Sequence, residues 1–412
     1  MRLRHAGGRT VHLGYCTNVH PAEELAGILA QLDTYAVPVR ETLDTDLLGL
    51  GLWLAAPVAA GLAADPAARG RLRTELTVRG LEVVTLNGFP YAAFQAPVVK
   101  GAVYRPDWTT GERLDYTLDL ARVLADLLPD DAERGSVSTL PLAWRAPWDG
   151  TRADAARRRL DQLAAGLAAV ERDTGRPVRV GFEPEPGCVV ESTAQAAAAL
   201  SGVDTGRLGI CLDLAHLACA WEEPAAALDR LAAAGLPVVK VQVSAALEAA
   251  DPAGDAAALR RWVEPRFLHQ TRTAGCATPT AGAANRPVPA DPAVPADPAD
   301  PAWAADDLDV ALDAALPGPW RVHYHVPLHA PPEPPLGSTL PVLRAALAAL
   351  FASPDAGCDH LDVETYTWGV LPAARRPRTD AELAAGIAAE LAFARDELVT
   401  LGLTPTEAAV AP

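Results

Sequence analysis

Several acidic, imidazole and amide side chains end or follow short apolar segments in the middle and C-terminal half of the chain. They are Glu183 and Glu185, Asp213 and His216, Gln242, His323 and His325, and Glu364. Carboxylate oxygens and imidazole nitrogens bind divalent cations, and a glutamine amide can add a neutral oxygen ligand. We therefore predict that this set binds a divalent metal (Zn²⁺, Mn²⁺, Mg²⁺ or Co²⁺), with Glu185 as a further ligand, a base or a substrate contact.

The spacing of these residues favours a shared site. In the D-x-x-H pattern, Asp213 ends an apolar run, and His216 three residues later can face the same point from a turn. In the H-x-H pattern, His323 and His325 lie on one face of a strand, because strand side chains alternate with a period of two. The alternatives are a His216 that bonds to the backbone at a helix start, and a histidine pair that only stacks or forms hydrogen bonds.

Four residues are candidates for catalysis. Glu183, Glu185 and Glu364 are carboxylates that can move a proton between substrate atoms. Lys240 lies two residues before Gln242, so in a strand both share one face and Lys240 is a candidate pocket cation. Gln242 is either a pocket group or a core amide whose hydrogen bonds are satisfied.

Weaker signals come from polar and aromatic residues in the first half of the chain and near the last apolar segment. The candidate substrate-binding residues are Asn18, His20, Asn87, Tyr91, Arg105, Asp107, Trp108, Tyr366 and Trp368. These residue types bind polyols, acids and phosphates, although loop packing explains many of them equally well. Arg105 or Lys240 would hold an anionic part of the substrate.

Nine apolar segments have the length and composition of strands. They are Val11–Thr17, Leu48–Leu54, Leu81–Asn87, Ser136–Leu142, Val178–Glu183, Leu208–Asp213, Val238–Val243, Val322–Val326 and Leu361–Tyr366. Helical patterns separate most of them. The clearest is Arg152–Thr174, with leucines at helical spacing and Gly175 as a stop signal.

Alternating strands and helices predict an α/β fold with a mostly parallel sheet, and we expect a (β/α)8 TIM barrel. In such a barrel all strands end at one face, which brings the candidate site residues together. Nine strands are one too many, so either Val322–Val326 or a segment near the N-terminus is expected to be accessory.

Composition narrows the class of protein. The chain has 412 residues, 50% hydrophobic and 21% charged, with a formal net charge of −17. This charge and the lack of basic clusters predict no binding to nucleic acid. The N-terminus lacks a signal-peptide core, and the uncharged run Leu47–Ala64 is expected to be a strand and a helix rather than a membrane span. Six scattered cysteines without a CxxC pair fit a reducing cytoplasm.

One domain is expected to span residues 1–412, with two irregular parts. Residues 273–302 are rich in Pro, Ala and Asp, without apolar periodicity, and are predicted to be a disordered insertion. Residues 404–412 are predicted to be a flexible tail. The insertion is either inert, a lid or a tether for a partner.

The order of these motifs resembles the xylose isomerase-like TIM-barrel superfamily, which includes sugar-phosphate isomerases, epimerases and endonuclease IV. The resemblance implies that Glu183, Asp213 with His216, Gln242 and Glu364 hold one or more divalent metals. The endonuclease-type D-x-H falls at His323–His325. Two departures are Gln242, where the superfamily has His, and His323, where the endonuclease type has Asp.

A narrower resemblance is to the EboE family of metabolite traffic proteins, encoded in the ebo gene cluster. Its motifs here are GYCTNVHP, TLNGFPY, VYRPDW, GSVSTLPL, FEPEPGC, CLDLAH, VQVSAAL, HYHVPL and VETYTW. The resemblance implies a cytoplasmic barrel protein, and other proteins of the same cluster are candidate partners. The cluster also encodes a UbiA-type prenyltransferase and a TatD-like hydrolase. The cluster is linked to moving secondary-metabolite precursors toward the periplasm.

These observations predict a metal-dependent isomerase or epimerase that acts on a small polar metabolite. The first alternative is a non-catalytic component that binds or traffics a metabolite in a degenerate barrel site. The second alternative is an endonuclease IV-like phosphodiesterase, which the negative charge disfavours.

Overall fold

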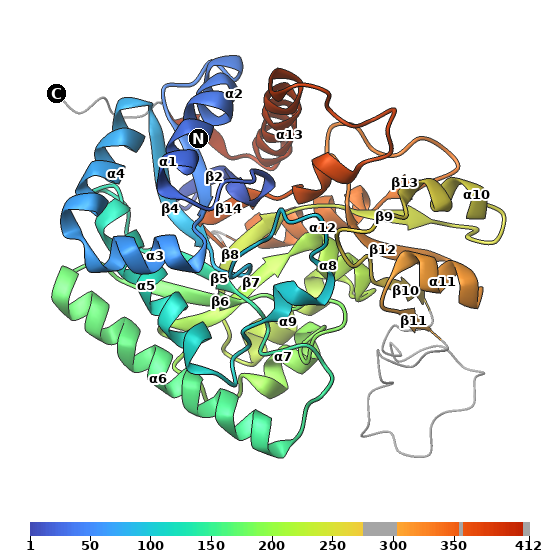
Figure 1. The fold of residues 1–412 in the computed structure, drawn as a ribbon, viewed down its shortest axis with the longest axis horizontal. Coiled ribbons are helices and arrows are strands. Elements are labelled where there is room, and N and C mark those ends of the chain that lie inside the picture. The colour runs from blue at the N-terminus through green and yellow to red at the C-terminus, as the bar shows by residue number, and fades with distance from the viewer. Residues whose placement is uncertain (275–302, 354–356, 407–412) are drawn as a thin grey trace.

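Eight parallel strands close into a barrel in the computed structural model, which describes residues 1–274, 303–353 and 357–406 (Figure 1). The strands are β2 (Thr10–Cys16), β3 (Leu48–Trp53), β4 (Leu81–Asn87), β5 (Gly135–Thr139), β6 (Val178–Phe182), β7 (Leu208–Asp213), β8 (Val238–Val243) and β14 (His360–Val363). The barrel closes because β14 pairs in parallel with both β8 and β2. The predicted (β/α)8 TIM barrel is confirmed.

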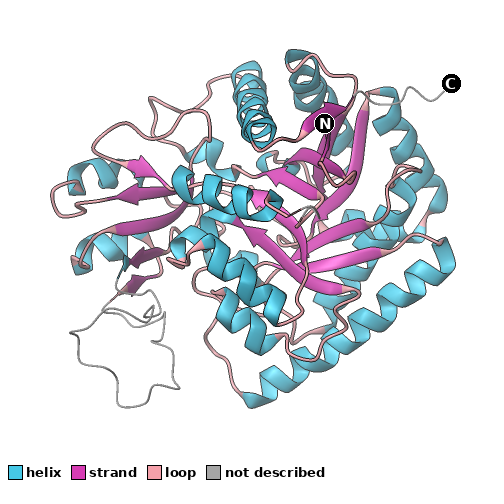
Figure 2. Cartoon of the chain, turned by 180° about the vertical axis from the view of Figure 1, so that it is seen from behind, coloured by secondary structure: helices cyan, strands magenta, loops and turns pink. Residues whose placement is uncertain are grey.

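Helices surround this barrel (Figures 1 and 2). They are α1 (Leu25–Gln31), α2 (Val37–Thr42), α3 (Ala56–Ala64), α4 (Pro66–Val78), α5 (Gly111–Leu127), α6 (Gly150–Thr174), α7 (Thr193–Ala199), α8 (Leu214–Cys219), α9 (Pro224–Ala233), α12 (Leu340–Phe351) and α13 (Asp380–Thr400). In α6 the side chain of Asp149 caps the first turn, and Leu160, Leu163 and Leu167 are buried. Gly175 ends α6 with a φ of 71°, in the left-handed region that favours glycine.

The interior of the barrel holds a buried ion pair. Lys240 Nζ of β8 lies 2.9 Å from Asp362 Oδ2 of β14, and both side chains are excluded from solvent. Glycine makes room for it on β3, because a Cβ atom at Gly51 would lie 1.7 Å from that carboxylate oxygen. Gly51 of the LGLGLW strand therefore serves this close approach, whereas a Cβ atom at Gly49 would meet the backbone of Leu13 and Gly14 on β2.

A second, antiparallel sheet is inserted between β8 and β14, beside the barrel (Figure 1). Its strands, in spatial order, are β11 (Ala304–Ala305), β10 (Thr271–Thr273), β12 (Trp320–His325), β9 (Ala246–Ala249) and β13 (Gly337–Ser338). The short helices α10 (Ala256–Leu259) and α11 (Leu308–Ala314) belong to the same insertion. The ninth predicted strand, Val322–Val326, falls largely in β12, so it is the accessory one.

Charged side chains fasten the inserted sheet to the barrel. Arg272 of β10 forms a buried ion pair with Glu191, which follows β6. The guanidinium of Arg321 in β12 lies 3.8 Å from the ring centroid of Trp221 and donates a hydrogen bond to Ala218 O, at the end of α8. These contacts fix β10 and β12 against the barrel.

The two predicted irregular parts lie partly outside the described residues. Thr273 belongs to β10, and residues 275–302 fall outside the description. Thr404–Thr406 forms β15, which pairs with β1 (Arg2–Arg4), and residues 407–412 fall outside the description.

The uncharged run Leu47–Ala64 folds as β3 followed by α3, as predicted. Within the described ranges, no helix combines the length and the apolar character needed to cross a membrane.

Candidate functional site

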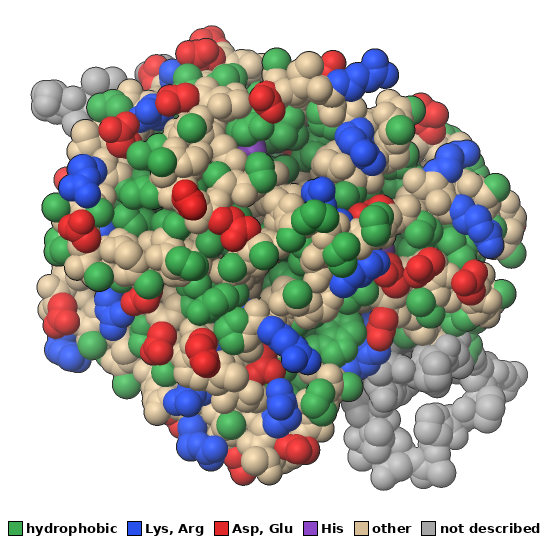
Figure 3. All heavy atoms as spheres, viewed as in Figure 1, with side chains coloured by type: hydrophobic (Ala, Val, Ile, Leu, Met, Phe, Trp, Pro, Cys, Tyr) green, Lys and Arg blue, Asp and Glu red, His purple; other side chains and the backbone are tan. Residues whose placement is uncertain are grey.

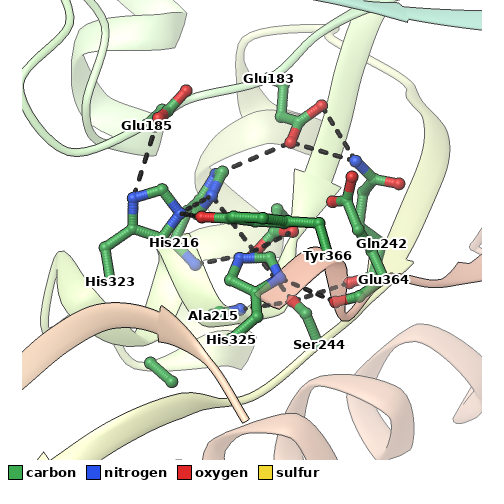
Figure 4. Close-up of polar contacts among 12 residues, drawn as sticks. Glu183, Glu185, Ala215, His216, Gln242, Ser244, His323, His325, Glu364 and Tyr366 are labelled. Atoms are coloured by element: carbon green, nitrogen blue, oxygen red, sulfur yellow. Dashed lines mark hydrogen bonds and ion pairs between the residues drawn. The ribbon is translucent and has the colours of Figure 1, made fainter. Parts of the chain in front are cut away.

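The predicted metal ligands converge where the barrel strands end (Figure 4). Glu183 follows β6, Asp213 ends β7, Gln242 lies in β8 and Glu364 follows β14. His216 lies in α8, one turn after Asp213, and His323 and His325 come from β12 of the inserted sheet. All of these side chains are buried. The site is therefore built by two sheets, and the H-x-H pair reaches it from outside the barrel.

Hydrogen bonds fix the tautomer of each of the three histidines. Each Nδ1 atom faces an oxygen that accepts: His216 Nδ1 lies 3.0 Å from Pro184 O, His323 Nδ1 2.7 Å from Gln270 Oε1, and His325 Nδ1 2.7 Å from Glu364 O. A carbonyl or amide oxygen cannot donate, so each Nδ1 carries the proton. Each neutral imidazole therefore presents an unprotonated Nε2.

The Nε2 atoms face one another and Asp213. His216 Nε2 lies 2.8 Å from His323 Nε2, and His325 Nε2 lies 3.9 Å from Asp213 Oδ2. Burial lowers the pKa of His216 to about 4 and that of His323 well below its usual value, so both are neutral near pH 7. Burial also lowers the pKa of His325. Two unprotonated nitrogens in contact repel, unless a cation accepts both lone pairs.

Only one of the two carboxylate oxygens of Asp213 accepts hydrogen bonds. Its Oδ1 accepts hydrogen bonds from His216 N at 2.9 Å and Ser244 Oγ at 2.8 Å. Its Oδ2 has no hydrogen-bond partner among the described residues. Burial opposes ionisation, but His216, His325 and these hydrogen bonds lower the pKa of Asp213 overall. An ionised, unpartnered carboxylate oxygen is a suitable ligand for a cation.

Two glutamates, Glu364 and Glu183, add further carboxylates to the site beside Asp213. Glu364 Oε1 accepts hydrogen bonds from Asn18 Nδ2 at 2.7 Å and Asn87 Nδ2 at 3.0 Å. Burial, followed by the charge of Asp213, raises the pKa of Glu364 to about 8. Burial, followed by Glu364 and Asp213, also raises the pKa of Glu183 well above its usual value. The buried carboxylates repel one another, and a divalent cation between them would relieve that repulsion.

Three groups of ligand atoms each lie within 4.8 Å of one another. They are His216, His323 and His325; Glu183, Asp213 and His216; and Asp213, His325 and Glu364. The groups share members, so their atoms surround neighbouring positions. The mixture of imidazole nitrogen and carboxylate oxygen fits a divalent transition metal.

Two strand residues of the predicted site have other contacts. Gln242 Nε2 lies 3.2 Å from both carboxylate oxygens of Glu183, so the amide orients that glutamate. Gln242 Oε1 has no hydrogen-bond partner among the described residues. Lys240 lies deeper, in the barrel interior, where it pairs with Asp362 and does not line the cavity described below.

A chain of hydrogen bonds connects Glu185 to the histidines. Tyr104 OH donates to Glu185 Oε1 at 2.7 Å and accepts from Gln270 Nε2 at 2.7 Å. Gln270 Oε1 accepts in turn from His323. Burial raises the pKa of Glu185 well above its usual value, while the hydrogen bond from Tyr104 acts in the opposite direction.

Residue type alone did not identify Tyr104 and Gln270 as residues of the site. The sequence signals that could have identified them are the position of Tyr104 in the VYRPDW motif and the position of Gln270 directly before β10.

A cavity opens at the site. Glu183, Glu185, His216, His323 and Glu364 form part of its lining. Among the candidate substrate-binding residues, Asn18, Asn87 and Tyr366 line it as well.

The other candidates from the first half lie elsewhere. His20 stacks on Tyr35 with 4.2 Å between ring centroids, and Tyr91 packs against the ring of Tyr116. Arg105 is exposed. None of the three lines the cavity.

Three further candidates are held by the protein itself. Asp107 Oδ2 lies 2.8 Å from Arg152 Nη2 in an ion pair. Trp108 is fully buried, and its Nε1 donates to a backbone oxygen. Trp368 Nε1 donates to Glu390 Oε2 at 3.2 Å. These contacts explain the polar and aromatic side chains as packing groups.

Solved structures to which the chain is similar include a probable dehydratase and two sugar epimerases. A probable 3-DHS dehydratase involved in petrobactin synthesis from Bacillus anthracis is 13% identical, with a TM-score of 0.38 over 57% of this chain and 73% of that one. D-psicose 3-epimerase from Clostridium cellulolyticum H10 is 13% identical, with a TM-score of 0.39 over 56% and 72%. L-ribulose 3-epimerase is 13% identical, with a TM-score of 0.49 over 95% and 96%.

Sequence comparison gives the family. No curated protein matches the chain. The family described as "Xylose isomerase-like TIM barrel" matches residues 53–265, from the end of β3 into the inserted region, which is more than half of the chain. With its closed parallel barrel and the acidic residues at its strand ends, the chain belongs to the xylose isomerase-like TIM barrel family.

Proposed function

We propose that the protein is a metal-dependent isomerase or epimerase that acts on a small metabolite. The observation that carries the proposal is the 2.8 Å contact between the unprotonated Nε2 atoms of His216 and His323, beside the unused oxygen of Asp213. A buried arrangement of this kind is costly without a cation.

The residues that would hold the metal are those of the three ligand groups. They are Glu183, Asp213, His216, His323, His325 and Glu364. Imidazole nitrogens in this set favour Zn²⁺, Mn²⁺ or Co²⁺ over Mg²⁺, which prefers oxygen ligands. Gln242 would orient Glu183 through its amide. When bound, the metal would polarise a carbonyl or hydroxyl oxygen of the substrate and offset developing negative charge.

The side chain best placed to move a proton is Glu185. It lines the cavity and belongs to none of the ligand groups. Tyr104 donates to one of its oxygens, which orients the carboxylate and opposes the effect of burial on its pKa. A carboxylate with a raised pKa can both accept and return a proton near neutral pH, as an isomerisation or epimerisation requires. Asn18 and Asn87 would keep Glu364 in place during the reaction.

Deuterium exchange tests the reaction class without knowledge of the product. The metal-loaded protein would be incubated in D₂O with hydroxyketones such as D-tagatose and D-fructose. Nuclear magnetic resonance would then follow the hydrogen next to the carbonyl. The proposal expects exchange for a hydroxyketone that binds, and its loss in Glu185→Gln. Binding of a hydroxyketone without any exchange would contradict an isomerase and favour a carrier.

The carrier is a second candidate function, and two observations favour it. Gln242 stands where the superfamily usually has a histidine, and its amide contacts Glu183. The motif set resembles the EboE family of metabolite traffic proteins, which suggests work with other proteins of that gene cluster in the cytoplasm. We therefore place either activity in the processing or trafficking of a secondary-metabolite precursor.

The phosphodiesterase alternative has less support. Lys and Arg side chains are interspersed with Asp and Glu side chains on the face in Figure 3. The formal net charge of −17 also opposes binding of a phosphate backbone.

A further inference from the structure

We propose that the substrate carries a flat apolar group, such as an aromatic ring, directly next to the oxygen atoms that the metal site would hold. This proposal rests on the proposed function, because it assigns a substrate class to the same site. It narrows the expectation of a small polar metabolite to one that also carries an apolar group.

The cavity is lined by two chemically different sets of side chains. One set is polar and includes Glu183, Glu185, Glu364, His216 and His323. The other set includes five aromatic rings, which we call the ring collar: Phe89, Phe94, Tyr104, Phe267 and Tyr366. Pro90, Val99, Val103 and Leu268 add further apolar lining. A ligand that fills this cavity therefore meets both charged and apolar side chains.

The ring collar begins directly beside the candidate metal ligands. The ring of Tyr366 lies 4.8 Å from the imidazole of His325, between centroids, and its OH lies 3.4 Å from His323 Nε2. The same ring lies 5.3 Å from Phe94 and 4.9 Å from Phe267. Phe94 and Phe267 are 5.2 Å apart. The substrate atoms that follow the polar end thus meet three mutually packed rings.

Two polar side chains of the cavity lining, Tyr104 and Lys100, already have partners. Tyr104 OH is shared between Glu185 and Gln270. Lys100, which also lines the cavity, forms an ion pair with Asp307. A sugar placed here would bury hydroxyl groups against the phenylalanine rings of the ring collar, which cannot accept or donate conventional hydrogen bonds, and such burial is unfavourable. A planar apolar group would instead stack against them.

Hydrogen bonds of the backbone hold the segment that carries Phe267, one ring of the ring collar, in place. Phe267 comes from the inserted region, and its backbone N–H donates to Glu264 Oε1 at 2.8 Å. Arg266 O accepts from the backbone N–H groups of Val99 and Lys100 at 2.7 and 2.8 Å. The segment that carries Phe267 is thereby tied to the loop of Val99 and Lys100, which also line the cavity.

The test uses two probes with the same chelating group. Acetohydroxamic acid carries a methyl group, and 2-naphthohydroxamic acid carries a flat apolar ring system. Both would be titrated calorimetrically into the full-length protein after loading with Zn²⁺, and the zinc content of each sample would be measured. We expect the naphthyl probe to bind at least about tenfold more tightly in the wild type.

Variants assign this preference to the ring collar. Phe94→Ala and Phe267→Ala should each reduce the ratio of the two affinities at least about threefold, and Phe94→Leu, which keeps apolar volume, should reduce it less. Phe393→Ala is the matched control, because Phe393 lies half-buried on α13 and outside the cavity lining. Near-ultraviolet circular dichroism would verify folding.

Two outcomes would overturn the ring collar as a specificity element. One is equal affinity of the two probes in the wild type. The other is a naphthyl preference that persists unchanged in folded Phe94→Ala, Phe94→Leu and Phe267→Ala. The measured zinc content tests the proposed function separately. A protein without zinc would contradict the metal site, while the preference between the two probes still reports on the ring collar.

Discussion

His216 Nε2 lies 2.8 Å from His323 Nε2, and the hydrogen bonds of both Nδ1 atoms leave these two nitrogens unprotonated. The contact joins a helix that follows a barrel strand to a strand of the inserted sheet. It is unfavourable in a neutral pair and favourable when a cation accepts both lone pairs. The insertion thus completes a site that the barrel alone leaves partly built.

The tautomer of His323 should depend on Gln270. In Gln270→Leu the His323 Nδ1 proton loses its acceptor, and Tyr104 loses a donor. We expect the affinity for Zn²⁺ to fall about 10- to 100-fold, because groups behind a metal ligand orient it. Competition with a chromophoric chelator measures this affinity. Gln162→Leu, an exposed position on α6, is the control. Equal affinity in Gln270→Leu and wild type would refute the orienting role.

The stability of the metal-free protein should depend on pH. Glu364 has a pKa of about 8 in the fold and about 4.5 as its ordinary value, so the folded state holds a proton that the unfolded state releases. The free energy of unfolding should therefore decrease as pH rises from 5 to 8, approaching about 1.4 kcal/mol per pH unit for each such proton.

Urea unfolding at several pH values, with and without Zn²⁺, measures this decrease. Zn²⁺ should reduce the decrease, because the bound carboxylate is already ionised. Glu364→Gln should reduce it in the metal-free protein. A steeper fall in the metal-loaded protein than in the metal-free one would contradict the assignment of Glu364 as a ligand.

The buried ion pair between Lys240 and Asp362 should stabilise the folded state. Lys240→Met leaves Asp362 buried without a counter-ion, and we expect a loss of about 3–5 kcal/mol in the free energy of unfolding. The double variant Lys240→Met with Asp362→Leu should recover part of that loss, because no uncompensated charge remains. Urea denaturation compares these variants with Arg122→Met, an exposed cation on α5. A double variant that is less stable than Lys240→Met would disprove the pairing argument.

The sequence alone predicts that the barrel residues of the candidate site lie close together. Glu183, Asp213 and Glu364 each come at or directly after the end of an apolar strand, and parallel strands end at one face of a barrel. The alternation within a strand likewise predicts that His323 and His325 share a face, because it is a local property. What the pattern could not supply is the sheet to which His323 and His325 belong, because an apolar strand looks alike in either sheet.

The remaining differences between the predicted and the observed site residues also arise from tertiary contacts. Trp108 and Asp107 have residue types found in pockets, but their contacts with Leu140 and Arg152 depend on how distant segments meet. Gln270 contributes through His323 and Tyr104, which come close only after the inserted sheet docks on the barrel. Such tertiary contacts leave no spacing signal in the chain.

The central claim is that these residues bind a divalent metal, and elemental analysis tests it most directly. The protein would be stripped with a chelator, reconstituted with Zn²⁺, Mn²⁺, Co²⁺ or Mg²⁺ and analysed by inductively coupled plasma mass spectrometry. Asp213→Asn is the decisive variant, since Asn can still accept at Oδ1 but replaces the unused Oδ2 with a nitrogen that cannot bind metal. Glu333→Gln, an exposed position, is the control.

We predict about one or more metal ions per chain in the wild type and in Glu333→Gln, and loss of metal in Asp213→Asn. No metal in the wild type after reconstitution, or full retention in Asp213→Asn, would contradict the account.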